Sequence, residues 1–289
     1  MSADSPGKRL KQLTAAGAQK IPGAFNALAA RMIERAGFQA LYVSGAAVSA
    51  GMGMPDIGLL TLSEVAEETR RITAAVLIPA IVDVDTGFGE AVNVERTVRT
   101  LEAAGAAAIQ IEDQRLPKRC GHLSGKELVS VDEMAAKVRA AVAARLDPDF
   151  VIIARTDARG VNGFDDAVAR ARAYRSAGAD AIFPEALQSA DEFARFRREV
   201  EGPLLANMTE FGKSPLLTFD ELAAIGYSLV LFPVTLLRLA MKAVGDGLAE
   251  IKATGSQRNL IGRMQTRQEL YDILGYAGYE QRDKTYFGG

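Results

Sequence analysis

The sequence predicts an α/β protein that forms a single (β/α)8 barrel. The predicted domain spans residues 1–289 and ends in a helical extension and a tail. Three observations support this prediction. Eight short, almost wholly apolar runs recur along the chain, which is typical of strands buried on both faces of a parallel sheet. Alanine-rich segments with helical spacing separate these runs. The 289 residues also suffice for a barrel, which needs about 250. A doubly wound sheet is the alternative, but nothing in the spacing marks its switch point.

The predicted strands share one feature, a polar or charged side chain near the end of each run. They lie at residues 20–25, 40–45, 79–85, 107–113, 149–157, 180–186, 203–209 and 228–234. Barrel enzymes build their sites at the C-terminal ends of the strands. The candidate residues are therefore Ser44, Asp83, Asp85, Glu112, Asp113, Arg155, Asp157, Glu185 and Asn207. One such residue would mark only where a strand surfaces, but this many carboxylates with an arginine favour a metal-and-anion site.

The helices between the strands have recognisable ends. Segments 93–106 and 165–179 have helical spacing and finish in Ala-Gly-Ala. The glycine of each, Gly105 or Gly178, could adopt the left-handed conformation that closes a helix.

Other residues mark where helices begin and where the barrel ends. Ser63, Asp165 and Asp220 are predicted as N-caps, because their side chains can accept a hydrogen bond from a free backbone N–H group. Beyond residue 234 the pattern becomes helical. The Gly- and Tyr-rich ending, residues 275–289, is predicted to be an arm or tail that contacts another subunit.

Composition narrows the function. A net charge of -2 leaves no basic excess for a phosphate backbone, so nucleic-acid binding is not expected. No run approaches the roughly 18 apolar residues of a membrane span, and the N-terminus has no apolar signal region. The single cysteine cannot form an internal disulfide and gives no sign of an oxidising compartment. We therefore expect a cytoplasmic protein that binds neither membrane nor nucleic acid.

The stretch DVDTGFG (residues 83–89) predicts a Mg²⁺ site. Asp83 and Asp85 are two apart at a strand end, so their side chains point the same way. Mg²⁺ usually binds one or two carboxylates and keeps several waters. A solvated turn is the alternative for this pair alone, but Glu112 and Asp113 at the end of the next strand favour the metal.

The stretch PKRCGHLSGKELV (residues 117–129) contains the only cysteine and the only histidine of the chain, Cys120 and His122. A lone cysteine or histidine is more often a buried structural residue, but this polar, glycine-containing segment cannot lie in a core. Lys118 and Arg119 would favour the thiolate, and such a thiol can give or take a proton. With no further His or Cys, a zinc cluster is excluded.

Three arginines, Arg155, Arg238 and Arg267, stand in apolar or uncharged surroundings. An exposed arginine on a helix is usually a solvated charge, and this holds for Arg267 taken alone, whereas Arg155 predicts an anionic substrate. Arg155 ends a buried strand and needs an anionic partner, and arginine binds carboxylates through two hydrogen bonds. Nucleotide binding has no support. Gly212-Lys213-Ser214 resembles the end of a phosphate loop, but position 207 is Asn where that motif needs Gly, and GMGMPDIG (51–58) lacks the dinucleotide spacing.

K-R-C-G-H, with DVDTGFG upstream and FPEA, LLANMTEFG and MQTRQELY downstream, resembles the isocitrate lyase/phosphoenolpyruvate mutase superfamily, and most of all its 2-methylisocitrate lyase branch. The resemblance covers nearly the whole chain. K-R-C-G-H is its specific element, since mutases, hydrolases and oxaloacetate decarboxylases of the superfamily lack that cysteine. The resemblance implies a barrel whose last helix is exchanged between the subunits of a homotetramer. It also implies a Mg²⁺-dependent retro-aldol cleavage of a 2-hydroxytricarboxylate to pyruvate and succinate.

The resemblance also implies a role for each matching residue. Asp83 and Asp85 would bind Mg²⁺, directly or through water, with Glu112 in its outer shell. Cys120 would protonate the carbanion, with Lys118, His122 and Glu185 as the other catalytic residues; Glu185 and a metal-linked water are both open as the base for the hydroxyl. The residues expected around the substrate are Ser44, Gly45, Ala46, Gly121, Arg155, Glu185, Asn207, Thr209, Arg238 and Arg267.

The choice of substrate depends on three apolar positions. Phe183, Leu231 and Pro233 stand where isocitrate lyases proper carry bulkier or more polar side chains, and they leave room for a methyl group. Cleavage of 2,3-dimethylmalate or of isocitrate is the alternative activity. A non-catalytic dicarboxylate-binding barrel is the alternative of a different class, and it predicts a damaged metal pair or a lost thiol, neither of which the sequence has.

Overall fold

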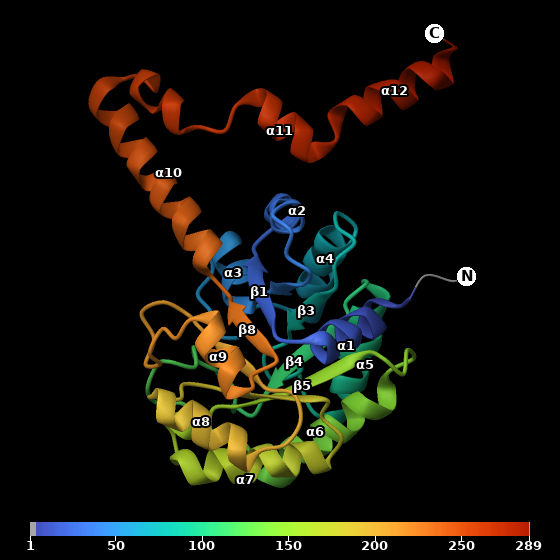
Figure 1. The fold of residues 1–289 in the computed structure, drawn as a ribbon, viewed down its shortest axis with the longest axis vertical. Coiled ribbons are helices and arrows are strands. Elements are labelled where there is room, and N and C mark those ends of the chain that lie inside the picture. Colours follow the sequence, from blue (N-terminus) through green and yellow to red (C-terminus); the bar gives the residue numbers. More distant parts are fainter. Residues whose placement is uncertain (1–3, 289) are drawn as a thin grey trace.

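The protein is a barrel of eight parallel strands surrounded by helices, as predicted. The computed structural model describes residues 4–288. The strand order is β6-β5-β4-β3-β2-β1-β8-β7, and a bridge between Ile182 and Leu204 joins the two ends of the sheet, so the barrel is nearly closed (Figure 1). The strands are β1 (Gln19–Ala24), β2 (Leu41–Val43), β3 (Ala80–Asp83), β4 (Ala108–Glu112), β5 (Val151–Thr156), β6 (Ala181–Pro184), β7 (Leu205–Asn207) and β8 (Leu229–Phe232). Each overlaps one predicted run.

Two apolar layers explain why the strand runs are apolar throughout. Alternate residues of a strand face opposite sides of the sheet. On β3, Ile81 packs inside the barrel, while Ala80 and Val82 pack outward against the helices. Both faces are therefore buried, as in other barrels of this class, and polar residues are confined to the strand ends.

The helices follow the strands in the alternation that the sequence predicts. They are α1 (Pro6–Ala16), α2 (Ala27–Arg35), α3 (Gly45–Gly51), α4 (Leu62–Thr73), α5 (Ala91–Ala103), α6 (Val131–Ala144), α7 (Phe164–Ser176), α8 (Ala190–Glu199), α9 (Phe219–Ile225), α10 (Thr235–Thr254), α11 (Arg267–Leu274) and α12 (Tyr276–Phe287), with short 3-10 turns at Ala158–Gly160 and Arg258–Arg263. Gly105 and Gly178 have φ of 86° and 106°, so their predicted left-handed conformation is confirmed.

The three predicted N-caps are wrong by two residues each, since the caps are Thr61, Gly163 and Thr218. Thr61 and Thr218 each accept a hydrogen bond from the backbone of a glutamate three residues on, whose carboxylate bonds back to the cap. The predicted caps lie instead inside the first turns of these helices, at Ser63, Asp165 and Asp220. There the negative charges of the two aspartates interact favourably with the positive end of the helix dipole.

The last three helices leave the barrel as an arm, which we call the C-terminal arm (residues 235–288). Helix α10 rises from the barrel, and α11 and α12 turn back past α2 (Figure 1). The ending that was predicted as an arm or tail is therefore helical. No residue of these described helices is buried, and apolar side chains such as Leu239, Leu248 and Ile251 are exposed on α10.

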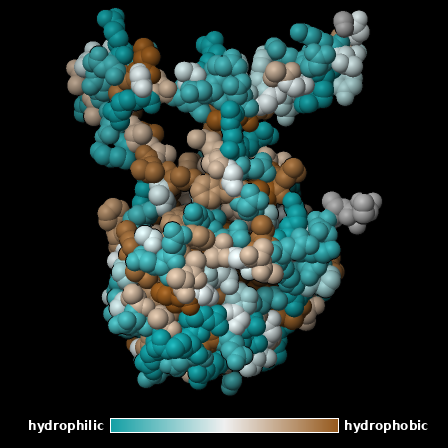
Figure 2. All heavy atoms as spheres, viewed as in Figure 1, coloured by the Kyte–Doolittle hydropathy of each residue, from teal (hydrophilic) through white to brown (hydrophobic). Residues whose placement is uncertain are grey.

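An apolar hollow of about 470 Å³ lies where the arm leaves the barrel. Phe25, Met32, Phe38, Leu236 and Ala240 line it, among other residues of α2 and α10. Figure 2 shows apolar side chains gathered on the surface between the barrel and the arm. Across residues 4–288, no helix combines the length and the hydrophobicity needed to cross a membrane.

Candidate active site

The C-terminal ends of the strands surround a cavity of about 90 Å³. Most of the residues that the sequence singles out line it: Ser44, Ala46, Asp83, Lys118, Cys120, Gly121, His122, Arg155, Phe183, Glu185, Asn207, Thr209, Leu231, Pro233 and Arg238. The loop that connects β4 to α6, residues 113–130, contributes four of these positions, and we call it the cysteine loop. Side chains from β2, β3, β5, β6, β7 and β8 complete the wall, so the tertiary structure brings together residues that are far apart in the chain.

Asp83 and Asp85 form a carboxylate pair beside the start of α3. The backbone N–H groups of Gly45 and Asp85 donate to the two oxygens of Asp83, at 3.2 and 3.1 Å. A side chain at position 45 would place its Cβ 3.1 Å from Asp83 Oδ2, so glycine permits this close approach. Burial, followed by the charge of Asp85, raises the pKa of Asp83 to about 6. The pair therefore favours a nearby positive charge.

Lys118 supplies such a charge from the cysteine loop. Its ammonium lies 2.7 Å from Asp85 Oδ1 and forms a second ion pair with Asp56. Burial lowers the pKa of Lys118, but the surrounding carboxylates, first Glu112 and then Asp85, raise it overall. Asp56 is a site residue that the sequence analysis missed, because GMGMPDIG was examined only as a nucleotide motif.

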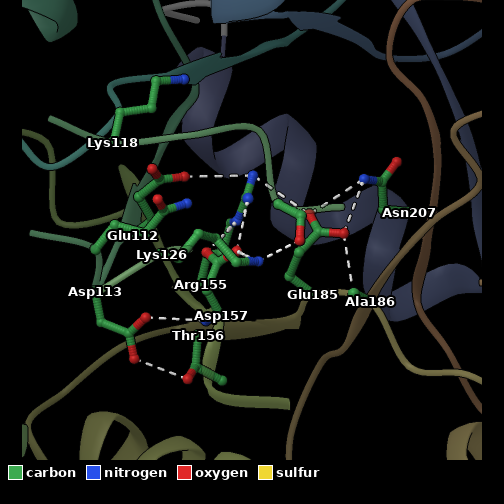
Figure 3. Close-up of polar contacts among 12 residues, drawn as sticks. Glu112, Asp113, Lys118, Lys126, Arg155, Thr156, Asp157, Glu185, Ala186 and Asn207 are labelled. Carbon is green, nitrogen blue, oxygen red and sulfur yellow. Dashed lines mark hydrogen bonds and ion pairs between the residues drawn. The ribbon is translucent and has the colours of Figure 1, made fainter. Parts of the chain in front are cut away.

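Arg155 lies at the centre of the site, between two glutamates (Figure 3). Its Nη1 is 3.3 Å from both Glu112 Oε2 and Glu185 Oε2. Its Nε and Nη2 donate to the two oxygens of Asp157 at 2.9 and 3.1 Å, which fixes the plane of the guanidinium. Burial raises the pKa of Glu112 well above its usual range, although Arg155 opposes this. The partners that Arg155 was expected to need are therefore carboxylates of the protein itself.

Glu185 has a different environment from Glu112. His122 Nε2 is 2.8 Å from Glu185 Oε1, and Asn207 donates to both carboxylate oxygens, at 3.4 and 3.2 Å. Burial alone would raise the pKa of Glu185, but Arg155 and His122 outweigh it and lower the pKa to about 2. Glu185 is therefore ionised and held in place near neutral pH.

His122 joins two loops. Its Nδ1 accepts a hydrogen bond of 2.8 Å from the backbone N–H of Lys213, which lies in the loop between β7 and α9. Since Nδ1 accepts, the ring proton is on Nε2, the nitrogen that faces Glu185. Gly212 packs so closely on the ring that an added Cβ would lie 2.6 Å from Nδ1. The glycine that the sequence analysis dismissed as part of a phosphate loop instead makes room for His122.

Cys120 and Gly121 lie over the mouth of the cavity. The thiol of Cys120 is exposed, as expected for a segment outside the core. Gly121 is buried, and an added Cβ would lie 2.7 Å from Glu185 Cδ and closer still to Arg155 Nη2 and Glu185 Cγ. The backbone of the cysteine loop therefore rests directly on the buried arginine–glutamate pair.

Asp113 does not belong to the site, contrary to its grouping with the strand-end residues. It accepts hydrogen bonds from Thr156 Oγ1 (2.8 Å), the backbone N–H of Asp157 (2.9 Å) and Tyr174 OH (2.8 Å), and Arg170 adds an ion pair. Adjacent strand residues face opposite sides of a sheet. Because Glu112 faces the barrel interior, Asp113 faces α7.

Of the two arginines predicted beyond the strand ends, Arg238 lies at the cavity and Arg267 does not. Arg238 lines the cavity, and its Nη1 donates to the backbone oxygen of Glu210 at 2.7 Å and contacts the carboxylate at 3.0 Å. Arg267 is the first residue of α11 in the C-terminal arm, is exposed and lies outside this cavity. Arg267 therefore does not line the cavity of its own chain, and its place beside the substrate stays a prediction.

The floor of the cavity contains a polar pair that the sequence analysis missed. Tyr42 OH donates to Gln110 Oε1 at 2.6 Å inside the barrel. Each of these residues precedes a predicted site residue, Ser44 or Glu112, by two positions, so the same face of the strand carries both. Strand alternation could have identified them.

The carboxylates fit a Mg²⁺ ion that keeps part of its water shell. Among residues 4–288, no three His, Cys, Asp or Glu side chains gather tightly enough to hold a metal by themselves. Asp83 and Asp85 are two such ligands, and Glu112 Oε1 is a buried oxygen without a hydrogen-bond partner. Mg²⁺ commonly binds through one or two carboxylates and several waters. The donor set therefore suits such an ion, which Asp83 and Asp85 would hold, with Glu112 as a further carboxylate nearby.

Comparison with known proteins identifies relatives along most of the chain. Residues 10–252 match the family described as phosphoenolpyruvate phosphomutase. The 2-methylisocitrate lyase of Aeropyrum pernix is 57% identical over 262 residues, which cover 91% of this chain and 84% of that protein. The 2-methylisocitrate lyase of Bacillus subtilis is 48% identical over a region that covers 96% of this chain and 92% of that protein.

Solved structures agree with the barrel in nearly every element. A crystal structure of 2,3-dimethylmalate lyase has a TM-score of 0.91 and 33% identity, covering 98% of this chain and 96% of that one. A phosphonopyruvate hydrolase in complex with oxalate and Mg²⁺ has a TM-score of 0.90 and 34% identity, covering 98% of this chain and 100% of that one.

Proposed function

Because the chain belongs to the phosphoenolpyruvate mutase/isocitrate lyase superfamily, we propose that it is a Mg²⁺-dependent carbon–carbon lyase that cleaves 2-methylisocitrate to pyruvate and succinate. The observation that carries the proposal is the position of Cys120–Gly121 over Arg155 and Glu185, with Asp83 lining the same cavity and Asp85 bonded to it. A proton donor, an anion-binding arginine and a pair of metal ligands are the groups that this reaction needs.

Substrate binding uses groups that lie around the cavity. Arg155 and Arg238 would bind carboxylates of the substrate through charge-assisted hydrogen bonds, and Asn207 and Thr209 would donate further ones. Ser44, Gly45 and Ala46 would hold the keto-acid end near Asp83. The metal, when bound, would stabilise negative charge that develops on the keto-acid oxygens.

The reaction removes a proton from the hydroxyl group and breaks one C–C bond. The bonding pair moves onto the leaving carbon and spreads into its carboxylate, where Arg155 stabilises the charge. The Cys120 thiol then transfers its proton to that carbon, which completes succinate. Glu185 is a poor candidate for the base that takes the hydroxyl proton, because its pKa is lowered to about 2. We assign it the role of orienting His122 and Arg155.

The preference for a methylated substrate rests on the apolar side of the cavity. Phe183, Leu231 and Pro233 line it, and a methyl group in such a pocket is worth about 1–3 kcal/mol. Identity favours 2-methylisocitrate over 2,3-dimethylmalate, since the relative named for the former is 57% identical and that named for the latter 33%. Weak cleavage of isocitrate is compatible with the same pocket.

We further propose a cytoplasmic homotetramer in which subunits exchange their C-terminal arms. The exposed apolar side chains of α10 and the apolar hollow beside α2 support this arrangement, since contiguous exposed apolar surface marks interaction sites. In such an assembly Arg267 could reach the site of a partner subunit. Measurement of the mass in solution by light scattering tests the assembly.

The function is tested by an end-point assay with Mg²⁺ that offers 2-methylisocitrate, isocitrate and 2,3-dimethylmalate separately and identifies the keto-acid product. We expect pyruvate from 2-methylisocitrate and little glyoxylate from isocitrate. Turnover of 2,3-dimethylmalate alone would keep the lyase chemistry and contradict the substrate. A folded, Mg²⁺-binding protein that cleaves none of the three would favour the non-catalytic, dicarboxylate-binding alternative.

A further inference from the structure

Lys126 is a buried lysine in the cysteine loop, a segment that is otherwise largely exposed. Its side chain is 1% exposed, and its ammonium is 2.7 Å from Asp157 Oδ1. The same ammonium donates a hydrogen bond to the backbone oxygen of Gly121. Lysine is almost never buried without a charged partner, and removing one partner of a buried ion pair is strongly destabilising. Lys126 therefore attaches the loop to the barrel, in addition to the contacts of Lys118 with Asp85 and of His122 with Glu185.

The barrel side of this attachment is rigid. Asp157 is fully buried and also accepts the two hydrogen bonds from Arg155, at 2.9 and 3.1 Å. The backbone N–H of Asp157 donates to Asp113 Oδ1 at 2.9 Å, and Asp113 is itself held by Thr156, Tyr174 and Arg170. The carboxylate that receives Lys126 thus also orients the guanidinium at the centre of the site (Figure 3).

The loop side of the attachment is the peptide next to the cysteine. Lys126 bonds the carbonyl of Gly121, and Gly121 rests on Arg155 and Glu185 without room for a side chain. Lys126 therefore connects the peptide next to Cys120 to the buried carboxylate of Asp157. Lys126 contacts the cavity wall through Gly121 but is not itself one of the residues that line the cavity.

We infer that Lys126 is a positioning residue, which fixes the Cys120–Gly121 segment over Arg155 by bridging Asp157 and the Gly121 carbonyl. Such a device is needed because the cavity of about 90 Å³ is smaller than the roughly 300–1,000 Å³ of typical ligand pockets. The cysteine loop has to withdraw to admit a tricarboxylate and then return to one defined position. The catalytic half of this inference rests on the proposed function, while the attachment of the loop does not.

The test combines a protease readout with kinetics on the full-length protein. Lys126→Met removes the charge and the donor, and Lys126→Gln keeps an amide that can reach toward the Gly121 carbonyl. Lys11→Met is the matched control, because Lys11 also bonds one carbonyl and one aspartate, Pro148 O at 3.1 Å and Asp149 Oδ1 at 3.2 Å, on α1. An arginine-specific protease reports loop opening through cleavage after the exposed Arg119. Circular dichroism checks that each variant is folded.

We expect Lys126→Met to be cleaved after Arg119 about tenfold faster than the wild type, which corresponds to about 1.4 kcal/mol of lost loop stability. In the lyase assay, kcat should fall by about 100-fold, as expected for a displacement of about 1 Å at the proton donor. KM should change by less than about threefold, because Arg155 keeps its other partners. The cleavage rate and the kcat of Lys126→Gln should lie between those of Lys126→Met and the wild type. Lys11→Met should match the wild type in both measurements.

The attachment of the loop and the positioning of the cysteine are contradicted by different results. Wild-type cleavage of a folded Lys126→Met protein would overturn the attachment of the loop, whatever the kinetics show. If Lys126→Met does not fold, wild-type cleavage and kcat of Lys126→Gln would overturn it instead. Faster cleavage with an unchanged kcat, or with a rise in KM alone, would refute the positioning role. A wild-type protein that is inactive on every substrate refutes the proposed function but leaves the protease result valid.

Discussion

Adding one methyl group at Gly121 tests the contact on which the proposed mechanism depends. In Gly121→Ala, the new Cβ would lie 2.7 Å from Glu185 Cδ and closer still to Arg155 Nη2 and Glu185 Cγ. Ordinary van der Waals contacts begin at 3.4 Å. The φ angle of Gly121 is outside the left-handed region, so alanine adds no backbone strain and the substitution is purely steric.

The magnitude follows from how far the neighbours have to move. Arg155 and Glu185 are buried and form an ion pair with each other, and Arg155 is also paired with Asp157, so the loop moves more easily than they do. A displacement of about 1 Å at the reacting groups lowers kcat by about 100-fold. Overpacking of this kind costs about 1–3 kcal/mol of stability, which leaves the protein folded.

The assay compares kcat, KM and the unfolding midpoint of Gly121→Ala with those of Gly51→Ala. Gly51 ends α3, and a Cβ there meets nothing within 4 Å, so this control should behave as the wild type. We expect a large loss of kcat in Gly121→Ala alone. A Gly121→Ala enzyme with kcat within about twofold of the wild type would refute the idea that the loop rests on Arg155 during the reaction.

Three further substitutions test single residues. Cys120→Ser should reduce turnover by at least about 100-fold while the melting temperature stays unchanged, because the thiol is exposed; wild-type rates would rule out its role as proton donor. Asp85→Ala should severely raise the Mg²⁺ concentration needed for half-maximal activity, and an unchanged Mg²⁺ titration would place the metal elsewhere. Glu185→Gln should cost about 3–5 kcal/mol at pH 7, because it breaks the buried ion pair with Arg155. The pKa of Glu185 is lowered from 4.5 to about 2, so its contribution is full above about pH 4.5 and is lost as the pH falls toward about 2. The unfolding free energies of Glu185→Gln and the wild type, measured in urea, should therefore become more similar as the pH falls over that range. A difference that does not change with pH would contradict a stabilising charge on Glu185.

The residues around the cavity divide into those that local patterns identify and those that they do not. Asp83, Arg155, Glu185 and Asn207 could be predicted because each ends an apolar run, and in a parallel barrel every strand ends at the same mouth. Asp113 had the same signature and lies outside the site. Strand alternation requires one of two adjacent residues to face away, but only the barrel decides which one.

Other parts of the site depend on contacts between distant segments. From the sequence alone, Lys126 would be expected to be a solvent-exposed charge on a loop. It is buried because its ammonium contacts Asp157, which lies 31 residues away in the chain. Asp56 joins the site only because Lys118 reaches back 62 residues to it. No local pattern encodes such pairings, since the partners lie on separate loops.

The sequence by itself therefore determined the barrel and the set of polar strand ends, and it placed Cys120 on a loop outside the core. These follow from periodicity and residue type, which act over a few neighbouring residues. The tertiary structure alone decided that Glu185 is ionised and paired with Arg155, and that Arg267 lies on an arm outside the cavity of its own chain. Burial and the charges of distant residues set a pKa, and the path of the C-terminal arm sets the location of Arg267, so both are properties of the assembled fold.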